Sequence, residues 1–498
     1  MRRGLLVFFS VLIVYVSFPT KNYYWDGIMF AQDIETGSGI PWFLHPNHLL
    51  YNPLGRELWL GANAAGLNLR ALTVLQIVSM VTGAATVALM FCVLLETGAS
   101  NYVALCLAMA FGFSATWWRF ATDAASYVPS MFLIVLCLWL LVREERPSAI
   151  AAGLLLCGAM LLHQLAALFV PAAALALWQR SKEQPRSSRL LSLLGFILAA
   201  GIPTVGLYAL VFAIEHEAWS LREFMRWIVS HSQDVSFSFD LPRNIWASVL
   251  GHIRLILGGN LRLVLGQRSP VSLVAAAALG VSLLLLIGRL VQIPPAFLRP
   301  MRSAVKRLLP VLLLWWGTYA VFLVVWLPRN TFYRLFYLPA LLVLGSAFIP
   351  DVKTKYNRLA LAVAALFLLN FGFYIYPQTK PESNPTLLVA DEMRAIWKPG
   401  DVVYWDVFRM ENRTIRYFNP QVEWRELWGR AYTSQIETSF KEGGDVWFDS
   451  TALTDYRRED QGLESWLLAN CVINESYEFP VGNNVVGFTR LQKLKPSK

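Results

Sequence analysis

Long apolar stretches separated by short polar connections recur along the first 376 residues of the chain. A helix needs roughly 20 mostly apolar residues to cross the hydrocarbon core of a bilayer. The pattern predicts about eleven membrane spans, several of them short, at residues 4–18, 71–95, 102–118, 125–142, 148–162, 165–178, 190–213, 270–288, 308–327, 335–350 and 359–376. No small-residue cleavage site follows the first span, so we interpret it as a retained helix rather than a signal peptide.

The pattern changes after Pro377, where apolar residues alternate with charged ones over short runs. These runs predict strands at Asp401–Val407, Val446–Phe448 and Val485–Leu491, and a helix at Leu387–Trp397 that ends before Pro399-Gly400. The predicted fold class is a polytopic α-helical membrane protein with a small C-terminal α/β domain. Residues 1–376 form the membrane domain and residues 377–498 the α/β domain.

The charge is unevenly divided between these two parts. Charged residues make up 15% of the chain, against about 25% in a soluble globular protein. Of the net charge of +10, residues 378–498 carry −3 and the membrane part carries +13. The α/β part therefore offers no basic surface of the kind that binds nucleic acid, and we exclude a nucleic-acid partner.

The basic residues of the membrane part predict its orientation. With the N-terminus inside, the short inner segments carry 16 Lys and Arg and the longer outer loops carry 12. This bias places the N-terminus in the cytoplasm, and an odd number of spans then places the C-terminal domain on the outer, extracytoplasmic side. Four of the five cysteines lie in apolar runs and no CxxC occurs, so neither a disulfide framework nor a zinc site is indicated. We expect a bacterial inner (plasma) membrane protein.

Two long outer loops, residues 19–70 and 214–269, are predicted on this topology. In the second, Leu221–Ile228 and Ile245–Leu265 alternate apolar residues with arginines, which is typical of helices that lie in the membrane interface. The first contains Asp26 between bulky aromatics and a glycine, followed by Asp33. Both are candidates for a general base, because a carboxylate can take a proton from a hydroxyl within hydrogen-bond reach. The alternative is an aromatic belt with a solvated carboxylate.

Polar residues at four further outer positions are candidate site residues. His45 and His48 could bind a metal together with Asp26, or could instead order a proline-containing loop. Arg119 and Asp123, expected in the connection 119–124, either contact substrate or form an ion pair that closes a hairpin. His163 and Gln164 form an isolated polar pair between two apolar segments, and either fill the core or face the same cavity.

The last candidate segment runs from Pro328 to Arg334. Arginines on the outer side are exceptions to the enrichment of basic residues in the inner loops, so we expect a negatively charged group to bind them. Arg329 and Arg334, with Tyr333 between them, either anchor the chain at lipid phosphates or bind the phosphate of a lipid substrate, which the guanidinium fork matches. All these candidates fall on one membrane face, which favours an enzyme acting on an anionic lipid over a transporter, whose ionisable residues lie near mid-membrane.

Three stretches resemble the type C glycosyltransferases, in particular the protein O-mannosyltransferase-like branch. They are Trp25-Asp26-Gly27 with His45-Pro46 and Asn68-Leu69-Arg70, then Thr122-Asp123-Ala124, and then Gly153–Leu177 around His163-Gln164. The resemblance covers about residues 1–180 well and the later spans in layout only. It implies a polyprenyl-phosphate sugar as donor, a hydroxyl on a glycolipid, glycan or protein as acceptor, and Asp26 as general base.

The chain departs from that family pattern at two positions. Gly27 stands where many members have a second acid, and His163 stands where related transferases often have a lysine. If that lysine meets the donor phosphate, His163 would have to be protonated, or Arg329 and Arg334 must take its place.

The mechanism we expect is direct displacement with inversion, in which Asp26 removes the acceptor proton and the arginines, with Arg119, hold the phosphate. A leaving phosphate already carries its charge, so no cofactor is required, and a divalent cation remains an option. An envelope polysaccharide polymerase or ligase using His216, His231, Arg222 and Arg243, or a lipid-linked sugar transporter or flippase, is the alternative.

Overall fold

The computed structural model describes residues 2–37, 43–143, 147–216, 219–229, 237–258, 270–290, 302–349, 353–406, 409–426, 432–450, 453–454 and 461–494. The chain divides into two compact units. Unit 1 comprises residues 1–20 and 33–377, and unit 2 comprises residues 21–32 and 378–498. The division passes through helix α2 (Trp25–Thr36), so the residues of the first predicted outer loop are shared between the two units.

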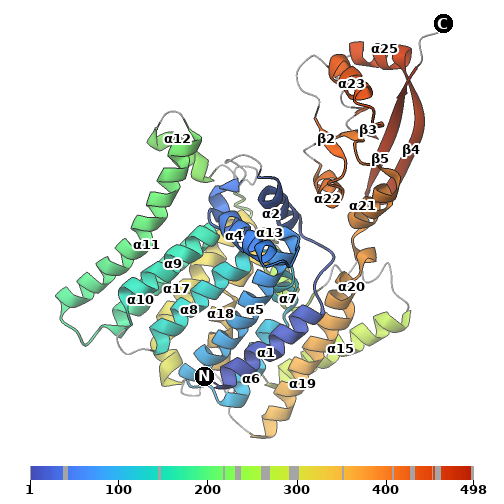
Figure 1. The fold of residues 1–498 in the computed structure, drawn as a ribbon. Coiled ribbons are helices and arrows are strands. Elements are labelled where there is room, and N and C mark those ends of the chain that lie inside the picture. Colours follow the sequence, from blue (N-terminus) through green and yellow to red (C-terminus); the bar gives the residue numbers. More distant parts are fainter. Residues whose placement is uncertain are drawn as a thin grey trace. The chain divides into compact units, whose positions relative to one another are not determined.

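Unit 1 is helical throughout its described part (Figure 1). Its helices are α1 (Arg2–Ser17), η1 (Pro46–His48), α4 (Tyr51–Ala64), α5 (Ala71–Glu96), α6 (Asn101–Gly112), α7 (Ala115–Ala121), α8 (Tyr127–Arg143), α9 (Ala149–Leu162), η2 (Gln164–Phe169), α10 (Val170–Arg180), α11 (Arg186–Glu215), α12 (Leu221–Val229), α13 (Leu241–Ile256), α15 (Pro270–Leu290), α17 (Ser303–Trp326), η4 (Phe332–Phe336), α18 (Leu338–Ser346), α19 (Lys353–Asn370), the π-helix η5 (Phe371–Ile375) and α20 (Tyr376–Gln378).

Helices lie in each of the eleven apolar segments predicted from the sequence. Among the described residues, five helices are long and apolar enough to cross a membrane, and a sixth span results if the bent pair α6–α7 is counted as one. The other apolar helices, such as α8 and α9, are shorter than the usual span. The number of membrane crossings therefore stays a prediction.

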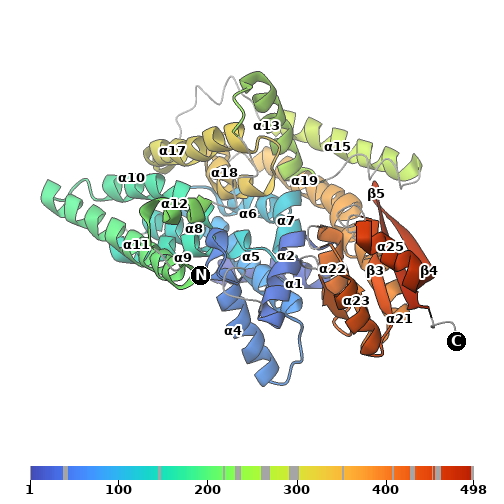
Figure 2. The same cartoon turned by 90° about the horizontal axis from the view of Figure 1, so that it is seen from above.

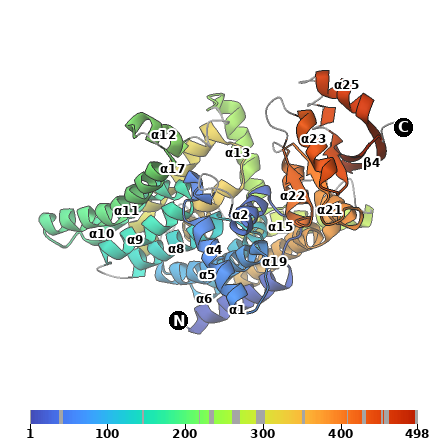
Figure 3. The ribbon, with the colours of Figure 1, turned by 45° about the horizontal axis from the view of Figure 1, so that its top comes forward.

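Close helix packing in unit 1 depends on small residues. Helices α9, α10 and α11 run beside one another (Figures 1 and 3). A methyl group at Gly153 of α9 would lie 2.6 Å from the carbonyl oxygen of Phe196 on α11, so only glycine permits this approach. Small residues at helix contacts are typical of membrane bundles, where dispersion forces rather than water drive association.

Helix α7 turns away from α6 by 67°. Asn370, the last residue before the π-helix, holds this bend: its amide donates to the carbonyls of Phe113 and Ile256, both at 2.8 Å, and its oxygen accepts from the backbone of Gly258 at 2.9 Å. Arg119 lies in α7, a short helix between α6 and α8, so the connection predicted at residues 119–124 begins within a helix. The helix continues because Trp117, Trp118 and Phe120 are all buried.

The two amphipathic helices predicted in loop 214–269 correspond to α12 and α13. Helix α13 begins earlier than expected, at Leu241, because Asp240 caps its first turn by accepting from the backbone of Arg243. The predicted helix continued to Leu265, but it ends at Ile256, and residues 259–269 lie outside the described part. Leu221 and Met225 of α12 are exposed one turn apart, which suits a helix lying in an interface.

Unit 2 contains a five-stranded sheet with strand order β2-β1-β3-β5-β4. Its elements are η6 (Pro381–Ser383), α21 (Pro385–Ile396), β1 (Val402–Tyr404), α22 (Met410–Phe418), β2 (Glu423–Arg425), α23 (Tyr432–Lys441), β3 (Val446–Asp449), α25 (Gln461–Asn470), β4 (Cys471–Val481) and β5 (Asn484–Lys493). Strands β2, β1 and β3 are parallel, whereas β5 and β4 are antiparallel to their neighbours.

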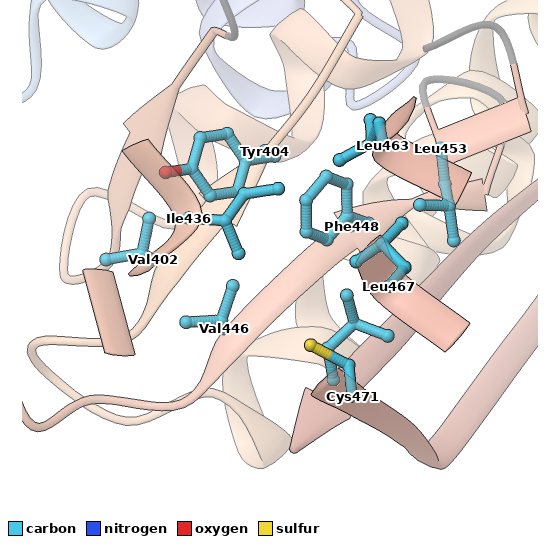
Figure 4. Close-up of a cluster of buried hydrophobic side chains, with 10 residues drawn as sticks. Val402, Tyr404, Ile436, Val446, Phe448, Leu453, Leu463, Leu467 and Cys471 are labelled. Atoms are coloured by element: carbon cyan, nitrogen blue, oxygen red, sulfur yellow. The ribbon is translucent and has the colours of Figure 1, made fainter. Parts of the chain in front are cut away.

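Side-chain alternation builds a separate core on each face of this sheet. Val402, Tyr404 and Phe448 pack on one face with Ile436 of α23 and Leu467 of α25 (Figure 4). The intervening residues Val403 and Trp447 pack on the other face with α21 and α22. Because strand side chains alternate between faces, both faces of these short strands are buried.

Candidate functional site

The tetrapeptide Leu-Pro-Arg-Asn occurs twice in the sequence, at residues 241–244 and 327–330. The first copy begins α13 and the second follows α17. A pocket of about 300 Å³ is lined by Arg243, Asn244 and Ala247 from α13 and by residues 327–330. Arg243 and Arg329 are both exposed, so the pocket carries two guanidinium groups from segments far apart in the chain.

A backbone hydrogen bond joins the two segments that carry the copies. The backbone of Ser238 donates to the carbonyl of Val325 at 2.8 Å, and α13 lies beside α17 (Figure 2). Within the copies, the amide of Asn244 donates to the carbonyl of Ser238 at 2.8 Å, while the oxygen of Asn330 accepts from the backbone of Tyr333 at 2.9 Å. Asn244 therefore fixes the chain that leads into α13, and Asn330 fixes the turn that leads into η4.

Arg334 lies next to the pocket but is completely buried. Its Nη2 donates to the carbonyl of Pro328 at 2.6 Å and its Nη1 donates to the hydroxyl of Tyr337 at 2.7 Å. That hydroxyl lies 2.8 Å from Nε2 of His252, whose Nδ1 lies 2.8 Å from the carbonyl of Ser248. Arg334 thus supports the loop that carries Arg329.

This arrangement leaves positive charge without internal compensation. In the part of the chain that the structure describes, no ion pair joins a carboxylate to Arg243, Arg329 or Arg334. A buried charge is costly unless it is paired and hydrogen-bonded. An anion in the pocket would reduce that cost, and a phosphate oxygen matches the guanidinium fork.

Several predicted site residues meet around Tyr127, Phe332 and Tyr333. The ring of Tyr333 lies 5.6 Å from that of His163 and 5.9 Å from that of Tyr127. Phe332 stacks on Tyr127 at 5.0 Å and lies 5.4 Å from Phe120, the neighbour of Arg119. The fold therefore brings His163 of the α9–η2 turn and Tyr333 of η4 to one region of unit 1, beside Phe120 of α7.

The first loop approaches the same turn. The rings of His45 and His48 stack at 4.4 Å, and the backbone of Leu50 donates to the carbonyl of Leu161 at 2.9 Å. Nδ1 of His45 accepts from the backbone of Asn47, and this bond caps the start of η1. Among the described residues, no group of three or more His, Cys, Asp or Glu could hold a metal ion.

His163 lies in the turn between α9 and η2, where it is buried. Burial, with a smaller contribution from His45, lowers its pKa to about 3. Nδ1 accepts from the backbone of Leu165 at 3.2 Å, which places the proton of the neutral ring on Nε2. A neutral ring cannot supply the positive charge of a lysine. Of the two options considered from the sequence, a protonated His163 or the arginines Arg329 and Arg334, only the arginines then carry a charge that can meet a phosphate.

The low pKa of His163 predicts a pH-dependent stability. The unfolded chain takes up a proton below its ordinary pKa of 6.5, whereas the folded protein does not until about pH 3. The contribution of the neutral ring to the free energy of unfolding is therefore complete above pH 6.5, and it is lost as the pH falls toward 3. We expect the Tm of the detergent-solubilised protein to fall less between pH 7 and pH 5 in His163→Asn, whose amide oxygen can still accept from Leu165, than in the unaltered chain. Equal falls in the two proteins would contradict a neutral, buried His163.

The remaining predicted residues occupy other places. Gln164 donates to the carbonyl of Ile228 at 3.1 Å, which links η2 to α12. Nη1 of Arg119 donates to the hydroxyl of Tyr374 in the π-helix at 3.4 Å, and the carboxylate of the buried Asp123 accepts from the backbone of Ala124 at 2.8 Å. Asp26 belongs to unit 2 and Asp33 to unit 1, although both lie on α2.

Arg243 was not predicted from the sequence to belong to this site. It was a candidate only for the polymerase alternative, with His216, His231 and Arg222. His216 instead stacks on Phe212 at 4.1 Å, and His231 lies outside the described residues. The signal that would have found Arg243 is the repeated tetrapeptide.

No protein-family model and no curated protein match the sequence. Among solved structures, the chain is similar to ArnT from Cupriavidus metallidurans bound to undecaprenyl phosphate, at 10% identity over 98% of this chain and 97% of that one, with a TM-score of 0.57. The apo state of ArnT gives 11% identity, 97% coverage of each chain and a TM-score of 0.55.

A third similar structure is a chain of the S. cerevisiae protein O-mannosyltransferase Pmt1-Pmt2 complex bound to the sugar donor. That match has 17% identity and a TM-score of 0.34, and it covers 43% of this chain and only 34% of that one. The ArnT matches span nearly the whole chain and establish the fold, which is the polytopic membrane fold of the type C glycosyltransferases.

Proposed function

We propose that this chain is a membrane glycosyltransferase that moves a sugar from a polyprenyl-phosphate donor to a hydroxyl acceptor at the outer face of the membrane. The observation that carries the proposal is the pocket between the two Leu-Pro-Arg-Asn segments, where Arg243 and Arg329 converge. ArnT, which shares the fold, has been solved bound to undecaprenyl phosphate. Two guanidinium groups next to an apolar helical bundle suit a ligand with a phosphate and a long hydrocarbon chain.

The proposed reaction is a single displacement at the anomeric carbon. The acceptor oxygen forms the new bond while the bond from that carbon to the phosphate oxygen breaks, which inverts the configuration. Asp26 takes the acceptor proton, and polyprenyl phosphate leaves with the bonding electron pair. Arg243 and Arg329 stabilise the charge that develops on the leaving phosphate, and Arg334 keeps the loop of Arg329 in place.

The proposed location follows from loop charge. Basic residues gather in the short inner segments, so the N-terminus is assigned to the cytoplasm and unit 2 to the outer face. A bacterial inner membrane fits the absence of a disulfide-type cysteine pattern in the sequence. The partners are then the lipid donor, the bilayer and a glycolipid, glycan or protein acceptor.

The decisive experiment uses the full chain in proteoliposomes with a panel of sugar-labelled undecaprenyl phosphates. Membranes from cells lacking the gene supply the acceptor. We expect the label to leave the donor and appear in an envelope glycan that mass spectrometry finds only when the gene is present. Movement of the labelled donor across the bilayer with no transfer would overturn the proposal.

That outcome would support the second candidate function, a transporter of lipid-linked sugars. One observation favours it: α6 and α7 form a helix pair bent by 67°, and α7 carries Arg119. Broken helices with polar groups at the break are common in transporters. Transfer of the label excludes a purely transporting role.

A further inference from the structure

The segment that carries Asp26 is held by the C-terminal unit. Residues 21–32 group with residues 378–498 and not with the rest of the first outer loop. We infer that this unit positions the general base. The positioning residues for Asp26 are the pair Tyr23 and Phe418, the single residue Asn384, and the pair Met29 and Arg413. The inference rests on the proposed function, because it takes Asp26 as the base.

Backbone bonds fix the start of the segment. The backbone amides of Lys21 and Asn22 both donate to the carbonyl of Gln378, at 2.7 and 3.2 Å. The side-chain amide of Asn384 donates to the carbonyl of Lys21 at 3.1 Å. Asn384 is itself fixed, because its oxygen caps α21 by accepting from the backbone of Leu387. The chain entering α2 is thus bonded to two residues more than 350 positions away.

Two side-chain contacts then flank Asp26, three residues before it and three residues after it. The ring of Tyr23 stacks on that of Phe418, with centroids 5.7 Å apart and planes inclined by 29°. Nη1 of Arg413 lies 3.1 Å from Sδ of Met29. Both partners belong to α22, which packs on the buried face of the sheet formed by Val403 and Trp447.

These contacts matter because of the geometry that proton transfer demands. A general base works within about 2.6–3.2 Å of the proton donor, and a displacement of about 1 Å can lower the rate about 100-fold. Helix α2 is short and begins at Trp25, so Asp26 sits in its first turn, where helices fray. The contacts from unit 2 supply the order that the first turn lacks.

The test compares Tyr23→Ala and Tyr23→Phe in the full chain, with the labelled undecaprenyl-phosphate sugar that supports transfer. Phenylalanine keeps the ring that stacks on Phe418, whereas alanine removes it. We expect kcat to fall about tenfold or more in Tyr23→Ala, with the KM for the donor unchanged, and to recover in Tyr23→Phe. An unchanged kcat in Tyr23→Ala overturns the inference.

A second variant, Asn384→Ser, keeps a side chain that can cap α21 and removes the amide that reaches Lys21. We expect faster hydrogen exchange in the peptide 21–32 of Asn384→Ser and Tyr23→Ala than in the unaltered chain. Exchange that stays the same in both variants overturns the inference, independently of any activity.

A double variant separates this inference from the proposed function. If Tyr23 acts through Asp26, Tyr23→Ala causes no further loss of transfer in an Asp26→Asn background. Equal losses in both backgrounds contradict the positioning role while leaving Asp26 as the base. Full transfer by Asp26→Asn alone removes Asp26 from the mechanism and with it the premise of the inference.

Discussion

Replacing Arg243 and Arg329 together by glutamine is expected to weaken binding of undecaprenyl phosphate by at least about 100-fold. A hydrogen bond to a charged group contributes about 1.5–3 kcal/mol, which corresponds to roughly a tenfold to hundredfold change in affinity for each arginine lost. The two residues line one pocket and have no carboxylate partner among the described ion pairs, so their charges are available to a ligand. Glutamine keeps a polar amide on an aliphatic stem while removing the charge.

The measurement is direct binding of undecaprenyl phosphate to the purified full chain in detergent. The matched control is Arg222→Gln with Arg226→Gln on α12, which removes the same charge from the same unit at exposed positions outside the pocket. Lysine at positions 243 and 329 is expected to recover part of the affinity, because it keeps the charge but not the fork. An affinity that falls equally in the α12 control would assign the effect to net charge and not to the pocket.

Hydropathy located the helices of unit 1 because few backbone structures are stable in a bilayer. Backbone polar groups in hydrocarbon must be bonded within the chain, so long apolar runs form helices there. The bend between α6 and α7 was missed, because Asn370, which holds it, lies about 250 residues away from Phe113. Local patterns carry no information about such a partner.

In unit 2, strands β1, β3 and β5 match the strands predicted from the sequence, whereas β2 and β4 were missed. β1 and β3 are short runs of Val, Tyr, Trp and Phe, which indicate strands directly. β4 is half exposed and contains Asn474, Glu475 and Pro480, so its composition resembles a loop. It exists as a strand because β5 pairs with it along its length, interrupted only by an irregularity between Ile473 and Glu475.

The candidate site was predictable in its residue types but not in its grouping. His163 was identifiable as an isolated polar residue in an apolar region, yet its neutral state follows from burial, which the sequence does not show. Arg334 and Arg329 lie in the same predicted outer segment and look alike in the sequence, but the fold buries Arg334 and exposes Arg329. The assignment of Asp26 and Asp33 to different units follows from contacts with residues after Gln378, which no local pattern reveals.

Asp26→Asn is expected to reduce transfer of the labelled sugar by about 10²–10⁴-fold, the usual contribution of a general base. Asparagine has nearly the same shape and keeps hydrogen-bonding atoms, but it cannot accept the acceptor's proton. Because the arginines that bind the phosphate are untouched, we expect the affinity for undecaprenyl phosphate to be retained. The combination of lost turnover and unchanged donor binding distinguishes a base from a residue needed for folding or binding.

The matched control for that variant is Asp391→Asn on α21. Asp391 belongs to the same unit, is half exposed and pairs with Arg394 one turn away at 3.1 Å, an arrangement that contributes little to stability. Transfer is expected to be unaffected there, so a loss in Asp26→Asn cannot come from unit 2's net charge. If Asp26→Asn keeps full transfer while Asp33→Asn abolishes it, the base is Asp33, and the proton is then taken by the part of α2 that belongs to unit 1.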